Sequence, residues 1–352
     1  MLSGKRVVIT GGTGSLGRVL VRRILQGELG EPAQVLVFSR DESKQQQMRM
    51  AYQHAQAATD DLMYDNFRRL LRFQIGDVGD YAAVCTALRG ADVVFNAAAL
   101  KQVPSCEYFP FEAVKTNILG PENIVRAIRE RDLTVETVVG ISTDKACKPV
   151  NVMGMTKALQ ERLFIKANLD CPGTRFVAAR YGNVLASRGS VIPLFHEQIR
   201  RGGPVTLTTP EMTRFLMSVE QAVDTVFAAL REARPGETYV PRLRSARISQ
   251  LADALIGDRP ITSTYLGIRP GEKTHEVLVS DEEAPRTVAR GAYYAIQPML
   301  PELLTAGEEA TPLDGEFSSA STVMAFDELV ALLRDSRMML EDQPQFAESS
   351  LG

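Results

Sequence analysis

The sequence has 352 residues, of which 45% are apolar and 24% charged, as in an ordinary soluble protein of one large or two modest domains. The net charge of −3 does not favour a nucleic-acid or anionic-membrane surface as a partner. Four cysteines without CxxC spacing and only three histidines argue against a metal site. No apolar run approaches the roughly 20 residues of a membrane span, and a strand begins too early for a signal peptide, so we expect a cytoplasmic protein.

The first predicted element is an apolar strand at Lys5 to Thr10, followed by a glycine-rich turn and a helical pattern. In this context the spacing Gly-x-x-Gly-x-x-Gly is a strong signal for dinucleotide binding. Glycines let the backbone approach a pyrophosphate, and the helix N-terminus favours its negative charge. The alternative is a purely structural turn in an α/β protein. The predicted cofactor contacts here are Gly11, Thr13, Gly14, Ser15, Leu16 and Gly17.

The second predicted strand, Gln34 to Phe38, ends where the adenosine ribose of a dinucleotide should lie. An NAD site favours a carboxylate at this point, whereas an NADP site favours a guanidinium and a hydroxyl for the 2′-phosphate. Ser39 and Arg40 fit NADP, although Asp41 could serve the 2′-hydroxyl of NAD. We therefore predict NADP as the cofactor, with NAD as the alternative.

Two further strand ends complete the predicted cofactor face. Asp77 and Val78 follow the strand Leu71 to Ile75, where Asp77 could contact the adenine amino group, cap the helix beginning near Tyr81, or do both. The strand Val93 to Phe95 runs into a set of small residues on which a cofactor can lie. These residues are Ala97, Ala98 and Ala99, and Lys101 beyond them is either a substrate contact or a surface lysine.

Next come a long helix at Phe111 to Arg131, a strand at Thr134 to Ile141 and a helix at Asn151 to Lys166. Met153 and Lys157 are four residues apart in that last helix and should therefore share a face. A sixth strand, at residues 175–180, continues the alternation. Repeated strand–helix units predict an α/β fold: a Rossmann-type, doubly wound parallel sheet with helices on both faces.

After residue 183 the alternation loosens. We expect an NADP-binding Rossmann domain at 1–183, a smaller α/β substrate-binding lobe at 184–340 with some returning segments, and a loose tail at 341–352. The predicted elements of the lobe are a helix ending at Arg201, a strand at Val205 to Thr208, a helix at Val219 to Arg231, a short α/β unit at 238–266, a helix beginning at Arg269 and a helix at Phe326 to Leu333.

Taken together, the motifs resemble those of the extended short-chain dehydrogenases, and within them the UDP-N-acetylglucosamine 4,6-dehydratases in their short soluble form. The resemblance covers nearly the whole chain, and STDKA together with RPGEK is far more specific than the glycine motif. The segments that carry it, in order, are TGGTGSLG, FSRDE, GDVGD, NAAALKQVP, KTNILG, STDKA, NVMGMTK, RYGNVLASRGSVIP, MTRF, GIRPGEKTHE and FSSAST.

This resemblance implies three coupled steps on a UDP-sugar. A hydride passes from C4 to NADP⁺, water leaves across C5–C6, and the hydride returns to C6. The product is a 4-keto-6-deoxy sugar for surface-glycan synthesis, with or without inversion at C5. The resemblance also suggests a homo-oligomer, either a hexamer or a dimer.

By the same resemblance, Lys145 is the base for the C5 proton and Asp144 the acid for the C6 hydroxyl, while Thr143 binds the C4 hydroxyl. Lys157 holds the nicotinamide ribose, and as a nearby cation it would lower the pKa of Lys145. The alternative for Asp144 and Lys145 is a surface turn after a strand. Cys147, with no histidine near it in sequence, is expected to line the site rather than to act as a nucleophile.

Met153 stands where the family usually has a catalytic tyrosine. A thioether cannot accept a proton at neutral pH, so the tyrosine's role is vacant. Methionine at this position also occurs in one branch of the resembling dehydratases, which argues for a variant site rather than an inactive one. The candidates to replace the tyrosine are Lys157 through a water molecule, Asp144, or Tyr181, and we favour the first two.

Substrate contacts are expected from the second lobe. Asn183 is placed for the diphosphate, Arg269 for a bidentate phosphate contact and Glu272 for ribose hydroxyls, although Arg269 and Glu272 also suit an ordinary helix start. The residues expected to contact phosphate or uracil are Arg188, Ser190, Val191 and Arg214.

Two other functions remain open at this point. A nucleotide-sugar 4-epimerase needs only the C4 redox step, and the pair Asp144 and Lys145 argues against it because epimerisation requires no elimination. A non-catalytic NADP-binding sensor could have lost its tyrosine, but it would have no use for that pair.

Overall fold

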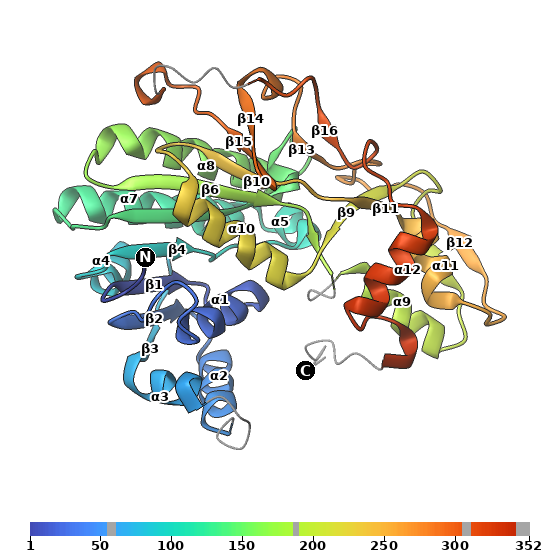
Figure 1. Ribbon diagram of the computed structural model, residues 1–352, viewed down its shortest axis with the longest axis horizontal. Helices are drawn as coiled ribbons and strands as arrows, with labels where there is room; N and C mark the ends of the chain where they lie inside the picture. Colours follow the sequence, from blue (N-terminus) through green and yellow to red (C-terminus); the bar gives the residue numbers. More distant parts are fainter. Residues whose placement is uncertain (55–60, 186–189, 305–310, 343–352) are drawn as a thin grey trace.

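The computed structural model of the chain describes residues 1–54, 61–185, 190–304 and 311–342. Its centre is a nine-stranded sheet in the order β14-β15-β10-β6-β5-β4-β1-β2-β3 (Figure 1). The strands of this sheet are β1 (Arg6–Thr10), β2 (Gln34–Ser39), β3 (Leu71–Ile75), β4 (Val93–Asn96), β5 (Thr137–Thr143), β6 (Arg175–Tyr181), β10 (Thr238–Pro241), β14 (Thr287–Arg290) and β15 (Tyr293–Ile296).

From β3 to β10 all neighbouring strands are parallel, and β15 and β14 add an antiparallel edge. The central strands are buried on both faces, which explains why they are continuous apolar runs rather than alternating patterns. The three edge strands β10, β15 and β14 come from the second half of the chain. The sheet therefore takes up segments that return to it after residue 184.

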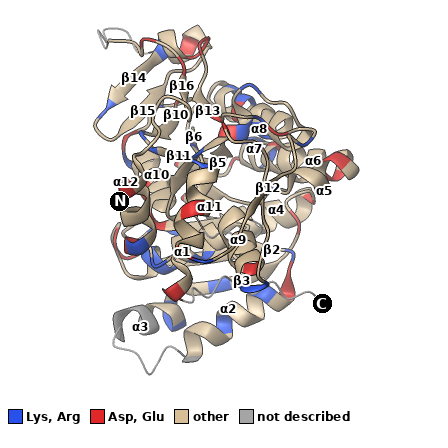
Figure 2. Ribbon diagram, turned by 90° about the vertical axis from the view of Figure 1, so that its right-hand side faces the viewer, with Lys and Arg blue, Asp and Glu red and all other residues tan. Residues whose placement is uncertain are grey.

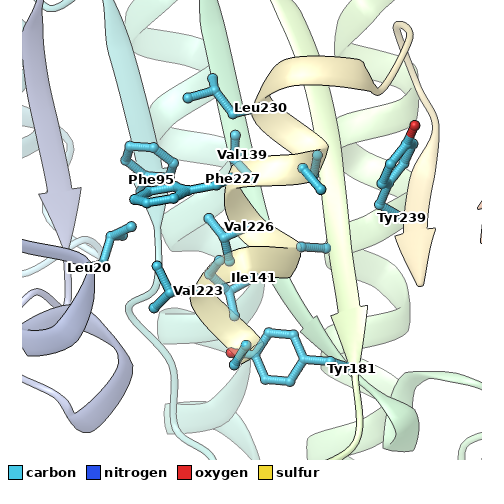
Figure 3. Close-up of a cluster of buried hydrophobic side chains, with 14 of the residues drawn as sticks. Leu20, Phe95, Val139, Ile141, Tyr181, Val223, Val226, Phe227, Leu230 and Tyr239 are labelled. Carbon is cyan, nitrogen blue, oxygen red and sulfur yellow. The ribbon is translucent and has the colours of Figure 1, made fainter. Parts of the chain in front are cut away.

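Helices cover both faces of the sheet, as predicted for a doubly wound fold. One face carries α1 (Ser15–Leu25), α3 (Asp61–Leu70) and α10 (Val219–Glu232). Figure 3 shows Leu20 of α1, Phe95 of β4 and Phe227 of α10 packing in the core on this face. The other face carries α4 (Tyr81–Leu88), α7 (Gly120–Glu130) and α8 (Val152–Asp170), which bury a second apolar cluster. The predicted fold class is confirmed.

A second lobe lies beside the sheet and has an apolar core of its own, with Phe195, Leu251 and Leu333 fully buried (Figure 1). In the view of Figure 2, acidic and basic residues are interspersed over the molecule. The helices and strands of the lobe are α9 (Val191–Arg200), β8 (Val205–Leu207), β9 (Thr213–Met217), β11 (Ser245–Arg247), α11 (Ile248–Ile256), β12 (Ser263–Tyr265) and α12 (Phe326–Asp335).

Three further strands are short: β7 (Asn183–Val184) pairs with β9, and β13 (Val277–Val279) pairs with β16 (Phe317–Ser318). Two short helices, α5 (Val103–Tyr108) and α6 (Pro110–Val114), pack against α8, and α2 (Glu42–His54) follows β2. The described residues contain no helix that is long and apolar enough to span a membrane.

Two helix predictions require revision. The long helix after Phe111 is interrupted by a π-helical segment, Lys115–Leu119, between α6 and α7. The helix predicted to begin at Arg269 is wrong, because the chain there forms turns. Gly271 has a φ of +79°, and its carbonyl accepts a hydrogen bond from the side chain of Asn151 at 2.8 Å, so a contact with α8 replaces helical bonding.

Candidate active site

The site is built at the carboxyl end of β5, where the strand passes into a 3-10 turn, Asp144–Ala146, and then into α8. The Thr143 hydroxyl accepts a hydrogen bond from the backbone of Lys145, and the Asn151 side chain caps α8. Gly154 lies so close to the turn that a Cβ there would be 2.2 Å from the Lys145 carbonyl oxygen. The start of α8 therefore holds the turn in place.

Asp144 is fully buried, and its two carboxylate oxygens have different surroundings. Oδ1 accepts from the Thr143 hydroxyl at 2.8 Å and from Lys145 Nζ at 3.0 Å. Oδ2 is buried and has no hydrogen-bond partner among the described residues. A buried polar atom without a partner requires an explanation, and a missing ligand is one that fits a functional site.

Lys145 lies between two carboxylates, because Glu276 Oε1 is 3.3 Å from its Nζ. Burial lowers the pKa of Lys145, but the charges of Asp144 and Glu276 outweigh burial and leave this pKa raised. The prediction that the pKa of Lys145 is lowered is therefore wrong. The cation that does lower this pKa is Arg214, and its effect is smaller. Sequence reasoning missed Glu276, although it ends the quoted GIRPGEKTHE motif.

Lys157 is buried, and its amine donates to the Ile141 carbonyl and to Gln160 Oε1, the latter at 2.6 Å. Burial lowers the pKa of Lys157 to about 7, although the nearby carboxylate of Glu161 acts in the opposite direction. An amine with this pKa can give up or take a proton near neutral pH.

The side chains of Met153 and Lys157 contact different neighbours. Met153 packs in an apolar cluster with Cys106 and Ala113, and its thioether cannot accept a proton at neutral pH. Tyr181 lies at one end of the core between the sheet and α10 (Figure 3), and burial raises its pKa. Neither residue is therefore suited to act as a base.

A buried ionic network lies behind the catalytic turn. Arg180 contacts Glu161 Oε2 at 2.6 Å and Glu283 Oε2 at 2.7 Å, and Ser142 donates to Glu161. The Cys147 thiol is 3.6 Å from Glu283, and burial raises its pKa to about 12, which does not suit a nucleophile. The network thus ties β5, α8, β6 and the 277–283 segment together around the turn.

The glycine turn has the close approaches that a dinucleotide site requires. Gly11 has a φ of +66°, and a Cβ on it would lie 2.7 Å from the Ala98 nitrogen and 2.8 Å from the Ala97 carbonyl carbon. A Cβ on Gly17 would lie 2.5 Å from the Gly12 Cα. Between these glycines lie Thr13, Gly14, Ser15 and Leu16, and α1 begins at Ser15. The turn and the Ala97–Ala99 segment therefore meet, as a cofactor cradle would.

At the end of β2, Arg40 is exposed and lies 3.2 Å from Asp77. Asp41 accepts from the Lys44 backbone at 2.9 Å, at the first turn of α2. The Ser39 hydroxyl accepts from the Gln45 side chain at 3.0 Å. Asp80, not Asp77, caps α4, so the capping alternative for Asp77 is wrong. The neighbouring Val78 is buried.

Three of the predicted substrate contacts have buried atoms without partners among the described residues. These atoms are Asn183 Oδ1, Ser190 Oγ and Glu272 Oε2. Val191 is the first residue of α9, Lys101 and Arg269 are exposed, and Arg188 lies outside the described residues.

The turn segment at 269–276 reaches the catalytic turn directly. Lys273 Nζ donates to the Cys147 carbonyl at 2.6 Å. Arg214, predicted to contact substrate, donates to the carbonyls of Lys273 and Thr274 at 2.9 and 3.1 Å. The Arg214 guanidinium thus holds this segment in place. No cluster of potential metal ligands occurs in the described ranges.

Comparison with known proteins shows which family the chain belongs to. A family described as "Polysaccharide biosynthesis protein" matches residues 7–298. The chain belongs to this family. Membership supports an enzyme of the nucleotide-sugar-modifying short-chain dehydrogenase type.

Two relatives, from Rickettsia typhi and Rickettsia felis, are named UDP-glucose 4-epimerase. They are 41% and 40% identical over 341 residues, which cover 95% of this chain and 91% of each relative. The X-ray structure of Pen from Bacillus thuringiensis has a TM-score of 0.84 and 33% identity, covering 96% of this chain and all of Pen.

The dTDP-glucose 4,6-dehydratase DesIV from Streptomyces venezuelae has a TM-score of 0.62 with 22% identity, covering 76% of this chain and 86% of that chain. At this identity the likeness supports the fold alone.

Proposed function

We propose that the protein is a nucleotide-sugar 4,6-dehydratase, acting on UDP-N-acetylglucosamine to give a UDP-4-keto-6-deoxy sugar. The observation that carries this proposal is the buried pair of Asp144 and Lys145 at the end of β5, with Asp144 Oδ2 left without a partner. An elimination needs one group to remove a proton and another to protonate the leaving hydroxyl. A site that only moves a hydride at C4 has no need for both.

Each group of the chain then has a defined task. A bound nicotinamide would supply the hydride chemistry at C4 and C6. Lys145 takes the C5 proton, Asp144 gives a proton to the C6 hydroxyl as the C6–O bond breaks, and Thr143 orients the C4 hydroxyl. For this step Lys145 must be neutral and Asp144 protonated, the state that forms when the Lys145 ammonium passes a proton to Asp144 Oδ1 across their 3.0 Å contact.

We assign the C4 hydroxyl proton to Lys157, with water as the relay. Its pKa of about 7 is the support for this assignment, because a buried neutral amine can accept the proton that a tyrosinate would otherwise take. Met153 then serves to fill the apolar cluster beside α5.

A 4-epimerase is the second candidate, and the specific observation in its favour is the name of the relatives at about 41% identity. The buried acid–base pair argues against it for this chain. A sensor without activity would not need a pair buried at the end of β5.

Purified protein incubated with NADP⁺ and UDP-N-acetylglucosamine should produce a UDP-sugar lighter by one water, measured by mass spectrometry. The matched control is the Lys145→Met variant, which keeps most of the side-chain volume and removes the amine. An unchanged mass with conversion to the C4 epimer would establish the epimerase instead. No change with any of several UDP- and dTDP-sugars would contradict both enzyme assignments.

We propose NADP as the cofactor. The supports are the exposed guanidinium of Arg40 at the end of β2 and the hydrogen bond that engages the Asp41 carboxylate with the Lys44 backbone in the first turn of α2. The DesIV structure contains NAD, which makes NAD the alternative.

An Arg40→Ala variant should bind NADP⁺ about 10-fold or more weakly, because a charge-assisted contact to phosphate contributes about 1.5–3 kcal/mol. Affinity for NAD⁺ should change little, since NAD⁺ has no 2′-phosphate. Isothermal titration calorimetry with both cofactors measures the two affinities. Equal losses for NADP⁺ and NAD⁺ would argue that Arg40 does not contact the 2′-phosphate.

We also propose a homo-oligomer, either a dimer or a hexamer, formed through the surface of α5, α6, the π-helical segment and α8. Large apolar side chains in monomers are usually exposed singly rather than as a contiguous patch. This surface exposes six of them, with exposed fractions between 41% and 83%: Tyr108, Phe109, Phe111, Leu119, Met155 and Leu159.

In a Phe111→Asp variant the charge would be buried in the interface, which should weaken association. The particles in solution should therefore have a lower molar mass than those of the parent protein. Size-exclusion chromatography with light scattering measures this mass. Phe326→Asp, at an exposed apolar position on α12, is the matched control and should leave the mass unchanged. A parent chain that is already monomeric would contradict the proposal.

A further inference from the structure

Glu276 lies beside Lys145 but has no role in the reaction steps proposed above. Its side chain is almost completely buried, directly before β13. Oε1 lies 3.3 Å from Lys145 Nζ and 3.8 Å from Arg214 Nε. Oε2 is buried and has no partner among the described residues, the same condition as Asp144 Oδ2.

The backbone of Glu276 is held on both sides. Its N–H donates to Ser319 Oγ at 2.9 Å, and its carbonyl accepts from the Ser319 N–H at 2.8 Å. Ser319 Oγ in turn lies 2.7 Å from Thr213 Oγ1 on β9. The FSSAST segment, whose purpose was not evident from the sequence, thus fixes the position of the Glu276 carboxylate.

The charges around Lys145 come from three separate parts of the fold. Asp144 is on the catalytic turn, Glu276 precedes β13, and Arg214 is on β9. The Lys145 ammonium and the Arg214 guanidinium face the carboxylates of Asp144 and Glu276, so two positive and two negative groups meet in a mostly buried space. Removing one of these groups leaves an opposite charge only partly compensated, which buried sites tolerate poorly.

We propose that Glu276 is a positioning residue that holds Lys145 Nζ at the reacting carbon and stabilises the ammonium that forms when Lys145 takes the C5 proton. This inference rests on the proposed dehydratase function, in which Lys145 is the base. The proton moves from C5 to Lys145 Nζ, the C5–H electron pair forms the C5–C6 double bond, and the C6 hydroxyl leaves as water with the proton from Asp144. A fixed carboxylate beside the developing positive charge lowers the energy of this step.

The direct test measures the proton affinity of Lys145 without turnover. Competitive acylation with acetic anhydride across a pH series, read by mass spectrometry of the Lys145 peptide, gives the midpoint at which this amine becomes reactive. The Lys145 side chain is 23% exposed, so the reagent can reach it. In the Glu276→Gln variant the midpoint should fall by about one pH unit or more, because a carboxylate in contact with the amine has been neutralised.

The matched control is Glu316→Gln. It removes a carboxylate that pairs with Lys148 rather than with Lys145, so the acylation midpoint of Lys145 should equal that of the parent. Coincident midpoints for Glu276→Gln and the parent would overturn the proposal. If Glu276→Gln does not fold, Ser319→Ala provides the second variant. It keeps the charge but releases a backbone contact, and a midpoint unchanged there as well would also overturn the proposal.

The turnover measurements separate this inference from the proposed function. Water loss in the parent, with a lowered midpoint and at least a 10-fold lower kcat in Glu276→Gln, supports both. A lowered midpoint in a protein that never eliminates water retains the contact between Glu276 and Lys145 but overturns the catalytic role of both residues.

Discussion

An Asp144→Asn variant is expected to lose water elimination by about 10²–10⁴-fold in kcat, the usual contribution of a general acid. Asparagine retains an oxygen that can accept from Thr143 and Lys145, as Oδ1 of Asp144 does at 2.8 and 3.0 Å. It has no proton to give to the C6 hydroxyl. Release of the dehydrated UDP-sugar, followed by mass spectrometry at saturating substrate, measures the effect.

The matched control is Asp281→Asn, an exposed carboxylate that pairs with Lys148, and it should retain the kcat of the parent. The hydride step at C4 should survive in Asp144→Asn, so reduced cofactor should still form on mixing and can be followed by its absorbance. A loss of less than 10-fold in elimination would show that another group protonates the C6 hydroxyl.

An Arg180→Met variant is expected to lose about 3–5 kcal/mol of unfolding free energy, measured by urea denaturation. Arg180 is buried between Glu161 and Glu283, at 2.6 and 2.7 Å. Removing the guanidinium would leave two carboxylates buried without their cation. The contact of Arg180 with Glu283 also outweighs burial and lowers the pKa of Glu283 to about 2.

The control is the triple variant in which Glu161→Gln and Glu283→Gln accompany Arg180→Met. It should recover part of the lost free energy, because no buried charge then lacks a partner. If Arg180→Met alone unfolds at the parent's urea midpoint, the network does not contribute to stability. If the triple variant is no more stable than the single one, the loss comes from packing rather than from uncompensated charge.

The positions of the strands along the chain up to β6 could be predicted because each is a local apolar run that ends in glycine or in small polar residues. Thr137–Thr143 is such a run, and it delivers the catalytic turn where the sequence pattern indicated. The antiparallel edge of β14 and β15 was not individually predictable. These strands are four residues each, and their pairing depends on β10, which lies far from them in the chain.

Predictions from local sequence patterns were wrong where a contact with a distant residue determines the backbone conformation. Arg269 to Glu272 has the composition of a helix start, but the hydrogen bond between Asn151 and Gly271 joins this segment to α8 instead. Asp77 and Asp80 both precede α4, and only the backbone geometry shows that Asp80 accepts from its first turn.

The charge state of Lys145 could not be predicted from its own segment. The sequence suggested a second cation nearby, whereas the fold brings Glu276 and Arg214 to this amine from beyond residue 200. By contrast, the buried position of Asp144 follows from its place at the end of a central parallel strand. Some residues of the site could therefore be predicted from the sequence. The charge state of Lys145 could not, because it depends on which distant segments pack against this amine.

The measurement that tests the central claim most directly is proton NMR of the product formed from UDP-N-acetylglucosamine in D₂O. The account predicts a 4-keto sugar with a new C6 methyl signal and solvent deuterium at C5, because Lys145 exchanges the proton it takes before C5 is reprotonated. A sugar inverted at C4 that retains its C6 hydroxymethyl group and its C5 proton would contradict the account.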